Sequence, residues 1–286
     1  MNRVIILLGQ RVRSGTNFVG TTLAQHPDVV TLPKDASLGE FNLFRDRDIL
    51  DCNFKAVSEM SFGMGITVAD STEFLRLYGE LWLQFLIDKY KVPEGKTIFL
   101  KSYVIHNLDL WRQAFPNSKI ALICRDGRDN VISSIKASND YRQWHSVSTR
   151  LKKRFNFYSG RLFINHTKHW KSTAKVFMNY QDDLNVKKFK YELLNNSEAG
   201  VRSLLDFYEL DHTPQIVTDC LHAPVVGSSF GYDTKKGKPN WTPDTNKSNY
   251  TFTRKWVRWG FLKKSAFKLL AGQALQELDY ETSKDW

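Results

Sequence analysis

Short apolar runs alternate along the chain with segments in which apolar residues follow a helical period. Residues 4–8 (VIILL) form a continuous apolar run bounded by Gly9, which is typical of a strand buried on both faces of a parallel sheet. The next segment begins at Ser14, has apolar residues at helical spacing and stops before Pro27. The chain is therefore predicted to open with a strand, a tight basic loop and a helix.

The same alternation continues downstream. Further strands are predicted at 97–100, 119–124 and 187–191, and helices at 71–90, 108–115, 129–137, 201–210 and 256–278. Residues 31–70 have no sustained period and are predicted to be irregular, whereas 227–249, rich in Gly, Pro, Ser, Lys and Asn, is predicted to be a long loop. Together these elements predict an α/β fold, with a mainly parallel central sheet flanked by helices in a single domain spanning 1–286.

Composition narrows the class of protein. The 286 residues are 42% hydrophobic and 25% charged, which is ordinary for a globular chain and excludes wholesale disorder, collagen and a disulfide scaffold. Lys plus Arg is 41 and Asp plus Glu is 30, and the resulting charge of +11 favours an anionic ligand or surface. This excess does not separate a nucleotide from nucleic acid, a sulfated glycan or a membrane.

Cysteine usage and hydropathy indicate the compartment. Cys52, Cys124 and Cys220 are widely spaced, so neither a disulfide framework nor a zinc knuckle is predicted, and a reducing cytoplasm suits them. The apolar run near the N-terminus is too short for a secretory signal. Since no stretch approaches the roughly 20 apolar residues that cross a bilayer, we expect a cytoplasmic protein without a membrane span.

The strongest chemical signal is the sequence GQRVRSGTN at 9–17, between the first predicted strand and helix. Backbone N–H groups and the positive end of the helix dipole converge at such a turn, which suits a phosphate or a sulfate. Gly15 lets the backbone approach an anion closely. Side chains that can bind an anion lie throughout the loop: Arg11, Arg13, Ser14, Thr16 and Asn17. The alternative is a helix capped by Ser14 beside two surface arginines.

A second signal, CRDGRDNVISS at 124–134, follows the strand predicted at 119–124. Arg125 at the strand end and Ser133 inside the next helix can close on a single phosphate. Ligands collect at the carboxyl ends of parallel strands, so this segment and the first loop are expected to share one edge of the sheet. The alternative is a solvated salt-bridge cluster of Arg125, Asp126, Arg128 and Asp129.

These motifs, RSGTN followed by AQHP and then RDGRDNVISS, resemble the PAPS-dependent sulfotransferases, particularly their bacterial members. KYELL at 190–194, GSSFG at 227–231 and LDYE at 278–281 are similar to weaker elements of that family. The resemblance implies a P-loop-like loop for the phosphosulfate. It also implies 3′-phosphoadenosine 5′-phosphosulfate (PAPS) as donor, 3′-phosphoadenosine 5′-phosphate (PAP) as product, and no metal.

The resemblance also assigns residues by position. It implies that Arg13 contacts the bridging oxygen and 5′-phosphate, that Arg125 and Ser133 bind the 3′-phosphate, and that Tyr191 lies beside the purine, with Phe230 as a stacking ring. A basic loop at 234–238 would close over the 3′-phosphate. Core roles for the aromatic rings and a solvated turn are the alternatives. The donor-binding candidates are Arg11, Arg13, Ser14, Gly15, Thr16, Asn17, Phe18, Arg125, Ser133, Tyr191, Ser229, Phe230, Lys236 and Gly237.

The catalytic base differs from that of the animal cytosolic branch, which has Lys-x-His where this chain has Lys101-Ser-Tyr103. Lys101 can still reach the sulfuryl group. In glycan-acting and many bacterial relatives the base is a Glu shortly after a turn like HPDV, which here stands at 26–29. Asp35 and Glu40 are the candidates, and Glu40 is preferred because the apolar run after it is expected to desolvate it. His106 is the reserve base.

The predicted reaction is in-line transfer of a sulfuryl group to a hydroxyl, or to a nitrogen, of a small-molecule, glycan or lipid acceptor. Segments at about 35–75, 141–175 and 232–250 are expected to select the acceptor. One alternative is a nucleotide-dependent kinase of related fold, although the loop lacks the GxxxxGK[ST] order of a nucleotide-binding P-loop. The other is a polyanion-binding or nucleic-acid-binding protein, because 141–175 is basic and aromatic. We expect no nucleic-acid partner.

Overall fold

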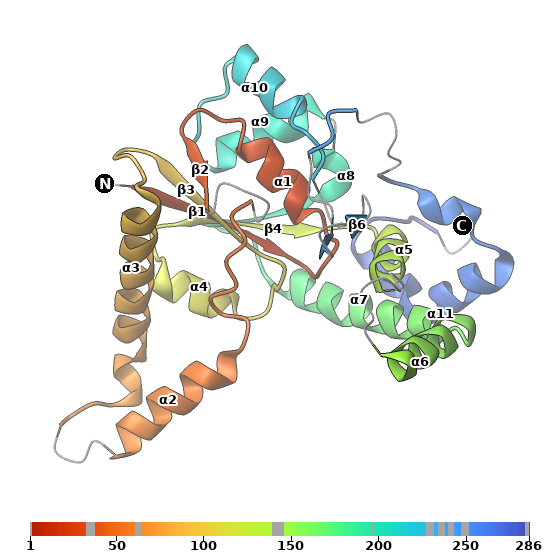
Figure 1. The fold of residues 1–286 in the computed structure, drawn as a ribbon, viewed down its shortest axis with the longest axis horizontal. Helices are drawn as coiled ribbons and strands as arrows, with labels where there is room; N and C mark the ends of the chain where they lie inside the picture. Colours follow the sequence, from red (N-terminus) through yellow and green to blue (C-terminus); the bar gives the residue numbers. More distant parts are fainter. Residues whose placement is uncertain are drawn as a thin grey trace.

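Helices cover both faces of a central parallel sheet (Figure 1). The computed structural model describes residues 2–32, 38–60, 64–138, 146–195, 197–226, 232–233, 238–239, 243–246, 252–283 and 286. The sheet has five strands in the order β2-β3-β1-β4-β5, and every pairing in it is parallel. The strands are β1 (Arg3–Gly9), β2 (Val29–Thr31), β3 (Thr97–Ser102), β4 (Lys119–Cys124) and β5 (Val186–Lys190). This architecture confirms the predicted α/β fold.

The helices follow the strands in alternation. They are α1 (Thr16–Leu23), α2 (Arg47–Met60), η1 (Val68–Asp70), α3 (Ser71–Tyr90), α4 (Leu108–Ala114), α5 (Gly127–Ser138), α6 (Val147–Tyr158), α7 (Arg161–Asn179), α8 (Tyr191–Leu194), α9 (Glu198–Phe207), α10 (Pro214–Leu221), η5 (Lys255–Arg258) and α11 (Phe261–Glu277). A separate antiparallel pair, β6 (Tyr232–Asp233) with β7 (Lys238–Pro239), falls in the predicted loop.

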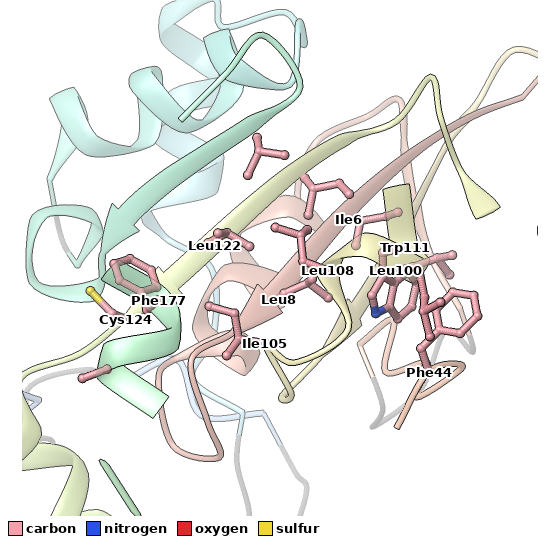
Figure 2. Close-up of a cluster of buried hydrophobic side chains, with 14 of the residues drawn as sticks. Ile6, Leu8, Phe44, Leu100, Ile105, Leu108, Trp111, Leu122, Cys124 and Phe177 are labelled. Atoms are coloured by element: carbon pink, nitrogen blue, oxygen red, sulfur yellow. The ribbon is translucent and has the colours of Figure 1, made fainter. Parts of the chain in front are cut away.

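Two hydrophobic clusters pack on opposite faces of the sheet. Alternate residues of β1 point to opposite sides, so Ile6 and Leu8 belong to one cluster and Ile5 and Leu7 to the other. Helices α3, α4, α7 and α11 complete the first cluster, part of which is drawn in Figure 2, and α1, α9 and α10 complete the second. Burial on both sides explains why β1 is a continuous apolar run instead of an alternating one.

The interval predicted to be irregular contains ordered elements. Helix α2 lies in it and is mostly exposed, although the apolar residues Leu50, Phe54 and Val57 recur in it at helical spacing. Exposed ion pairs one turn apart support α2: Arg47 with Asp51 at 3.1 Å and Lys55 with Glu59 at 3.5 Å. Strand β2 has three residues and pairs with β3 at the sheet edge. The prediction of an irregular segment was therefore wrong for α2, and for the end of β2 at Thr31.

Smaller differences have local causes. Tyr191 begins α8 instead of ending β5. The helix predicted at 256–278 divides into η5 and α11, because the backbone is extended at Trp259 and Gly260. Helix α10 was not predicted, although Thr213 caps its N-terminus and Pro214 occupies its first turn. Among the residues that the structure describes, no helix combines the length and apolar character needed to cross a bilayer.

Two helical glycines differ in the space around them. A Cβ atom at Gly79 of α3 would lie 2.3 Å from the backbone oxygen of Ala114 at the end of α4, whereas at Gly272 of α11 the nearest atom, Cβ of Lys268, would be 3.8 Å away. We therefore expect Gly79→Ala to lower the free energy of unfolding by about 1–3 kcal/mol through overpacking. Gly272→Ala should raise it by up to about 1 kcal/mol through helix propensity. Urea denaturation of both variants checks this, and two changes of the same sign would contradict the packing described for α3 and α4.

Candidate active site

Four strands end at one edge of the sheet, and a polar segment follows each of them. In the parallel register Leu8 is paired with Ser102, Gly9 with Ile123, and Cys124 with Lys190, so β3, β1, β4 and β5 finish close together. The backbone N–H of Gln10 donates to the carbonyl of Ile123 at 2.8 Å, which ties the loop after β1 to β4. Both sequence motifs therefore lie at the same edge, as predicted.

The loop after β1 is shaped by its own backbone. The Ser14 hydroxyl accepts a hydrogen bond from the Arg11 backbone N–H at 3.2 Å, and therefore stabilises the turn instead of capping α1. Arg13 and Gly15 have positive φ angles of 70° and 100°. At Gly15 a Cβ atom would lie 2.3 Å from the ring of Tyr191, so this position requires glycine for packing as well as for its φ angle. The loop thereby leads directly into the N-terminus of α1.

Side chains of the two motifs meet around Arg13. Its Nε donates to the Ser133 hydroxyl of α5 at 3.0 Å, and Nη1 of Arg125 donates to the Arg13 carbonyl at 3.2 Å. Burial, and then the charge of Arg125, lower the pKa of Arg13. Nε of Arg125 is buried and has no hydrogen-bond partner among the described residues. A buried and a half-buried guanidinium group next to one hydroxyl are an arrangement suited to a bound anion.

Tyr191 lies beneath this cluster. Its ring is buried, contacts Phe18 edge-on at 5.5 Å between centroids, and carries the Arg125 guanidinium 4.7 Å above its centre. Burial raises the pKa of Tyr191 to about 12, so its phenol stays neutral. The ring therefore supports both the glycine of the first loop and the arginine of the second motif. Its predicted place beside a purine stays a prediction.

A second charged group lies on the other side of the loop. Lys101 at the end of β3 is 1% exposed, hydrogen-bonds through Nζ to the Asn17 side chain, and lies 3.8 Å from Oε2 of Glu40. Burial lowers the pKa of Lys101 to about 8, while the Glu40 carboxylate opposes that shift. The Glu40 side chain is 37% exposed, so the desolvation expected from the apolar run after it is incomplete. Its nearest charge is the Lys101 ammonium.

Two further candidates, Arg11 and His106, do not join the cluster around Arg13. Arg11 is buried, and its guanidinium donates to the His166 carbonyl at 2.8 Å and to His166 Nδ1 at 3.1 Å. Burial lowers the pKa of Arg11 to about 10; burial and the charge of Arg11 lower the pKa of His166 to about 4, which keeps that imidazole neutral. Arg11 thus joins the loop to α7. His106 is exposed, and among the described residues no hydrogen bond or ion pair joins it to Glu40 or Lys101.

The acidic residues of the second motif form their hydrogen bonds and ion pairs with groups other than Arg125. Arg128 is buried, is bound by Asp126 at 2.6 Å and by Glu281, and lies between the rings of Trp256 and Trp286. The predicted solvated cluster is therefore wrong for the Asp126–Arg128 pair, because it is a buried network closed by the chain's C-terminal segment. The LDYE sequence, interpreted above as a weak family element, supplies Glu281 to that network.

Lys255 lies near the site, and the sequence did not predict this position. The Asp129 carboxylate accepts hydrogen bonds from the backbone N–H groups of Arg254 at 2.6 Å and Lys255 at 2.7 Å. This positions Lys255 where the charges of Arg125 and Arg13 add to burial in lowering its pKa. Lys255 thus joins the positive cluster at the sheet edge. The two adjacent basic residues Arg254 and Lys255 were the only sign of this role in the sequence. They lie about 130 residues after the second motif, and nothing in the sequence connects them to it.

The remaining candidates cannot be placed. Asp35, Ser229, Phe230, Lys236 and Gly237 lie outside the described residues. Within the part of the chain that the structure describes, no group of three or more His, Cys, Asp or Glu side chains could hold a metal ion.

Comparisons with known proteins agree with this geometry. Residues 5–214 match the model of the sulfotransferase family, so the chain belongs to that family. The sulfotransferase domain of the Synechococcus PCC 7002 olefin synthase is similar in fold, with a TM-score of 0.52, 15% identity, and coverage of 99% of this chain and 96% of that one. Mouse sulfotransferase SULT7A1, solved as a complex with PAP, has a TM-score of 0.52, 13% identity, and coverage of 98% and 86%.

A search of curated proteins found no match. The family assignment makes the chain an enzyme of the sulfotransferase class and does not favour the kinase or the nucleic-acid-binding alternative.

The buried network around Arg128 leads to a stability prediction. Glu281→Gln removes one carboxylate from a buried guanidinium, and we expect the free energy of unfolding to fall by about 1.5–3 kcal/mol. Glu198→Gln is the matched control, because the Arg202–Glu198 pair at 2.9 Å is exposed and its loss should cost less than about 1 kcal/mol. Equal losses in urea denaturation would mean that Glu281 does not stabilise the second motif.

Proposed function

We propose that this enzyme transfers a sulfuryl group from PAPS to a hydroxyl, or to a nitrogen, of its acceptor. The observation that carries the proposal is the meeting of two guanidinium groups, the buried one of Arg125 and the half-buried one of Arg13, with the Ser133 hydroxyl at the edge where β1 and β4 end. A donor with phosphates at both the 3′ and the 5′ position needs two anion sites on one edge, and the two motifs supply them.

The site residues suit such a donor. Arg125, Ser133 and Lys255 would bind the 3′-phosphate, and the unpartnered Nε of Arg125 is a donor that a phosphate oxygen would satisfy. Backbone N–H groups at the start of α1, with Gly15 to permit close approach, would bind the 5′-phosphosulfate. Because these groups lie on rigid elements, they are oriented before the donor binds, which reduces the entropic cost of binding.

In the transfer step, the residues around the loop after β1 would stabilise the charge that develops as the sulfuryl group moves. The acceptor oxygen forms a bond to sulfur while the bond from sulfur to the bridging phosphate oxygen breaks, so negative charge grows on the departing phosphate. By analogy with phosphoryl transfer, the enzyme's contribution is positioning and charge stabilisation. Arg13 would stabilise the bridging oxygen. Lys101, joined to the loop through Asn17, would stabilise the sulfuryl oxygens, since its ammonium is protonated below about pH 8.

Glu40 is the proposed base that accepts the proton of the acceptor. Its backbone is paired with Lys101 in a parallel bridge, and its carboxylate lies 3.8 Å from the Lys101 ammonium, next to the group that would hold the sulfuryl oxygens. Oε1 of Glu40 also accepts a hydrogen bond from Asn42 at 3.4 Å, which restrains the carboxylate. His106 lacks comparable contacts with the loop and stays the reserve. Because Glu40 is partly exposed, the acceptor would approach the site from this side.

The donor assignment can be tested by ligand binding. PAP should raise the melting temperature of the protein, whereas ATP and an oligonucleotide should not. Arg125→Ala should weaken PAP binding by about 10–100-fold, because it removes charge-assisted hydrogen bonds to phosphate. Arg202→Ala, which removes an exposed arginine paired with Glu198, is the matched control and should bind PAP normally. Stabilisation by ATP but not by PAP would contradict the proposal.

Turnover separates the two arginines and tests the base. With labelled donor and an acceptor found by screening, Arg13→Ala should lower kcat by about 10²–10³-fold, whereas Arg125→Ala should mainly raise the donor KM. Glu40→Gln should lower kcat by about 10²–10⁴-fold without changing PAP binding. The assay is run well below pH 8, so that Lys101 stays protonated in every variant. A Glu40→Gln rate near that of the wild type would assign the base to His106 or Asp35.

A further inference from the structure

Helix α6 carries large apolar side chains on the face that points away from the protein. Val147, Leu151, Phe155 and Tyr158 recur at intervals of three or four residues, which places them in one stripe, and each is between 60% and 82% exposed. The half-buried positions Lys153 and Asn156 lie on the opposite face of the helix. No residue of α6 is fully buried. This is the reverse of the arrangement in a helix that packs its apolar face onto a core.

The charges around this stripe are all positive. Arg150 and Arg154 flank it on one side and Lys152 on the other. The chain has no Asp or Glu between Asp140 and Asp182, so the sequence around α6 contributes positive charge only. A partner that covers the stripe therefore meets a one-sided positive field, and a negatively charged surface is favoured.

The start of α11 extends the same surface. Phe157 of α6 lines a cavity of about 460 Å³ together with Trp259 and Lys263, so these two parts of the chain are neighbours, as Figure 1 also shows. Phe261 and Leu262 are each 81% exposed. We call the whole the basic amphipathic surface. It consists of Val147, Arg150, Leu151, Lys152, Arg154, Phe155, Tyr158, Phe261, Leu262, Lys263 and Lys264.

The residue types in this surface favour anionic lipid over nucleic acid or a second copy of the chain. Single exposed apolar residues are common on proteins, but a grouped set marks an interaction site. A nucleic-acid base could stack on the exposed rings of Phe155, Tyr158 and Phe261, but it would leave the aliphatic side chains of Val147, Leu151 and Leu262 in water. Lipid acyl chains would cover both kinds of side chain. A second copy of the chain would bring two positive surfaces together, which is unfavourable. An apolar stripe between basic flanks suits the boundary between lipid headgroups and acyl chains.

We propose that the basic amphipathic surface docks this enzyme onto membranes that contain anionic lipid. Helix α6 lies in the plane of the interface, its apolar stripe enters the headgroup boundary, and the flanking Arg and Lys side chains bind lipid phosphates. The docking is peripheral and reversible. It does not depend on the proposed donor, since none of these residues belongs to the site at the sheet edge, although α6 lies within the segment expected to select the acceptor.

Flotation of the full-length protein with vesicles tests the proposal. The wild type should float with vesicles of equal parts phosphatidylcholine and phosphatidylglycerol, not with phosphatidylcholine alone, and added salt should release it. Val147→Ser with Leu151→Ser should weaken binding by about tenfold or more, because two apolar side chains no longer leave water. Leu77→Ser with Leu81→Ser is the matched control: these residues have the same spacing on α3, are 50% and 67% exposed, and should leave vesicle binding unchanged.

The possible outcomes separate the partners. No flotation of the wild type, or equal loss in both double variants, would overturn the proposal. Tight binding of a labelled oligonucleotide that survives Val147→Ser with Leu151→Ser, without vesicle binding, would assign the surface to nucleic acid instead. A dimer in light scattering that the same variant dissociates, again without vesicle binding, would assign it to self-association. The melting temperature without ligand, measured in parallel, should stay close to that of the wild type in both double variants, which shows that they are folded and keeps this test independent of the donor assignment.

Discussion

The site depends on one contact between motifs that are far apart in the chain: the hydrogen bond from Arg125 to the carbonyl of Arg13. It exists because β1 and β4 are adjacent and parallel, so that the loop after one strand and the residue after the other meet at a single edge. The buried guanidinium of Arg125 and the half-buried one of Arg13 are thereby brought close together, and burial with the charge of Arg125 lowers the pKa of Arg13. Such a pair is unfavourable by itself and is relieved by a bound anion.

The acidic residues of the second motif form their hydrogen bonds and ion pairs with other groups, although the charge of Arg125 opposes the rise in the Asp129 pKa that burial causes. Asp126 binds Arg128, and Asp129 accepts from the backbone of Arg254 and Lys255. The C-terminal segment reinforces the arrangement through Glu281, and Tyr280 donates to Glu192 at 3.1 Å. One short sequence therefore has two functions: Arg125 faces the candidate donor site, while its neighbours anchor the helix and the chain end behind it.

The outer helices are much more exposed than the site at the sheet edge. Helices α2 and α6 are largely exposed, and α3 carries exposed apolar residues beside its packed face. Of these helices, α6 combines an outward apolar stripe with positively charged residues on both sides of it. The basic and aromatic segment 141–175, for which the sequence allowed more than one role, thus contributes a defined surface. The candidate donor site and the basic amphipathic surface both carry positive charge, but the first holds it in guanidinium groups that are hydrogen-bonded within the protein and the second in exposed side chains.

The strands β1, β3 and β4 and helix α3 followed from the sequence alone, since each has a strong period or an unbroken apolar run that local propensity supports. The sequence also determined that RSGTN and RDGRDNVISS lie at one edge, because parallel strands leave little choice. Tertiary structure decided the rest. Arg11 and Arg13 are two residues apart, yet one is directed to α7 and the other to Ser133. The roles of Arg128, Glu281 and Lys255 depend on contacts across more than a hundred residues, and such contacts leave no periodic pattern in the chain.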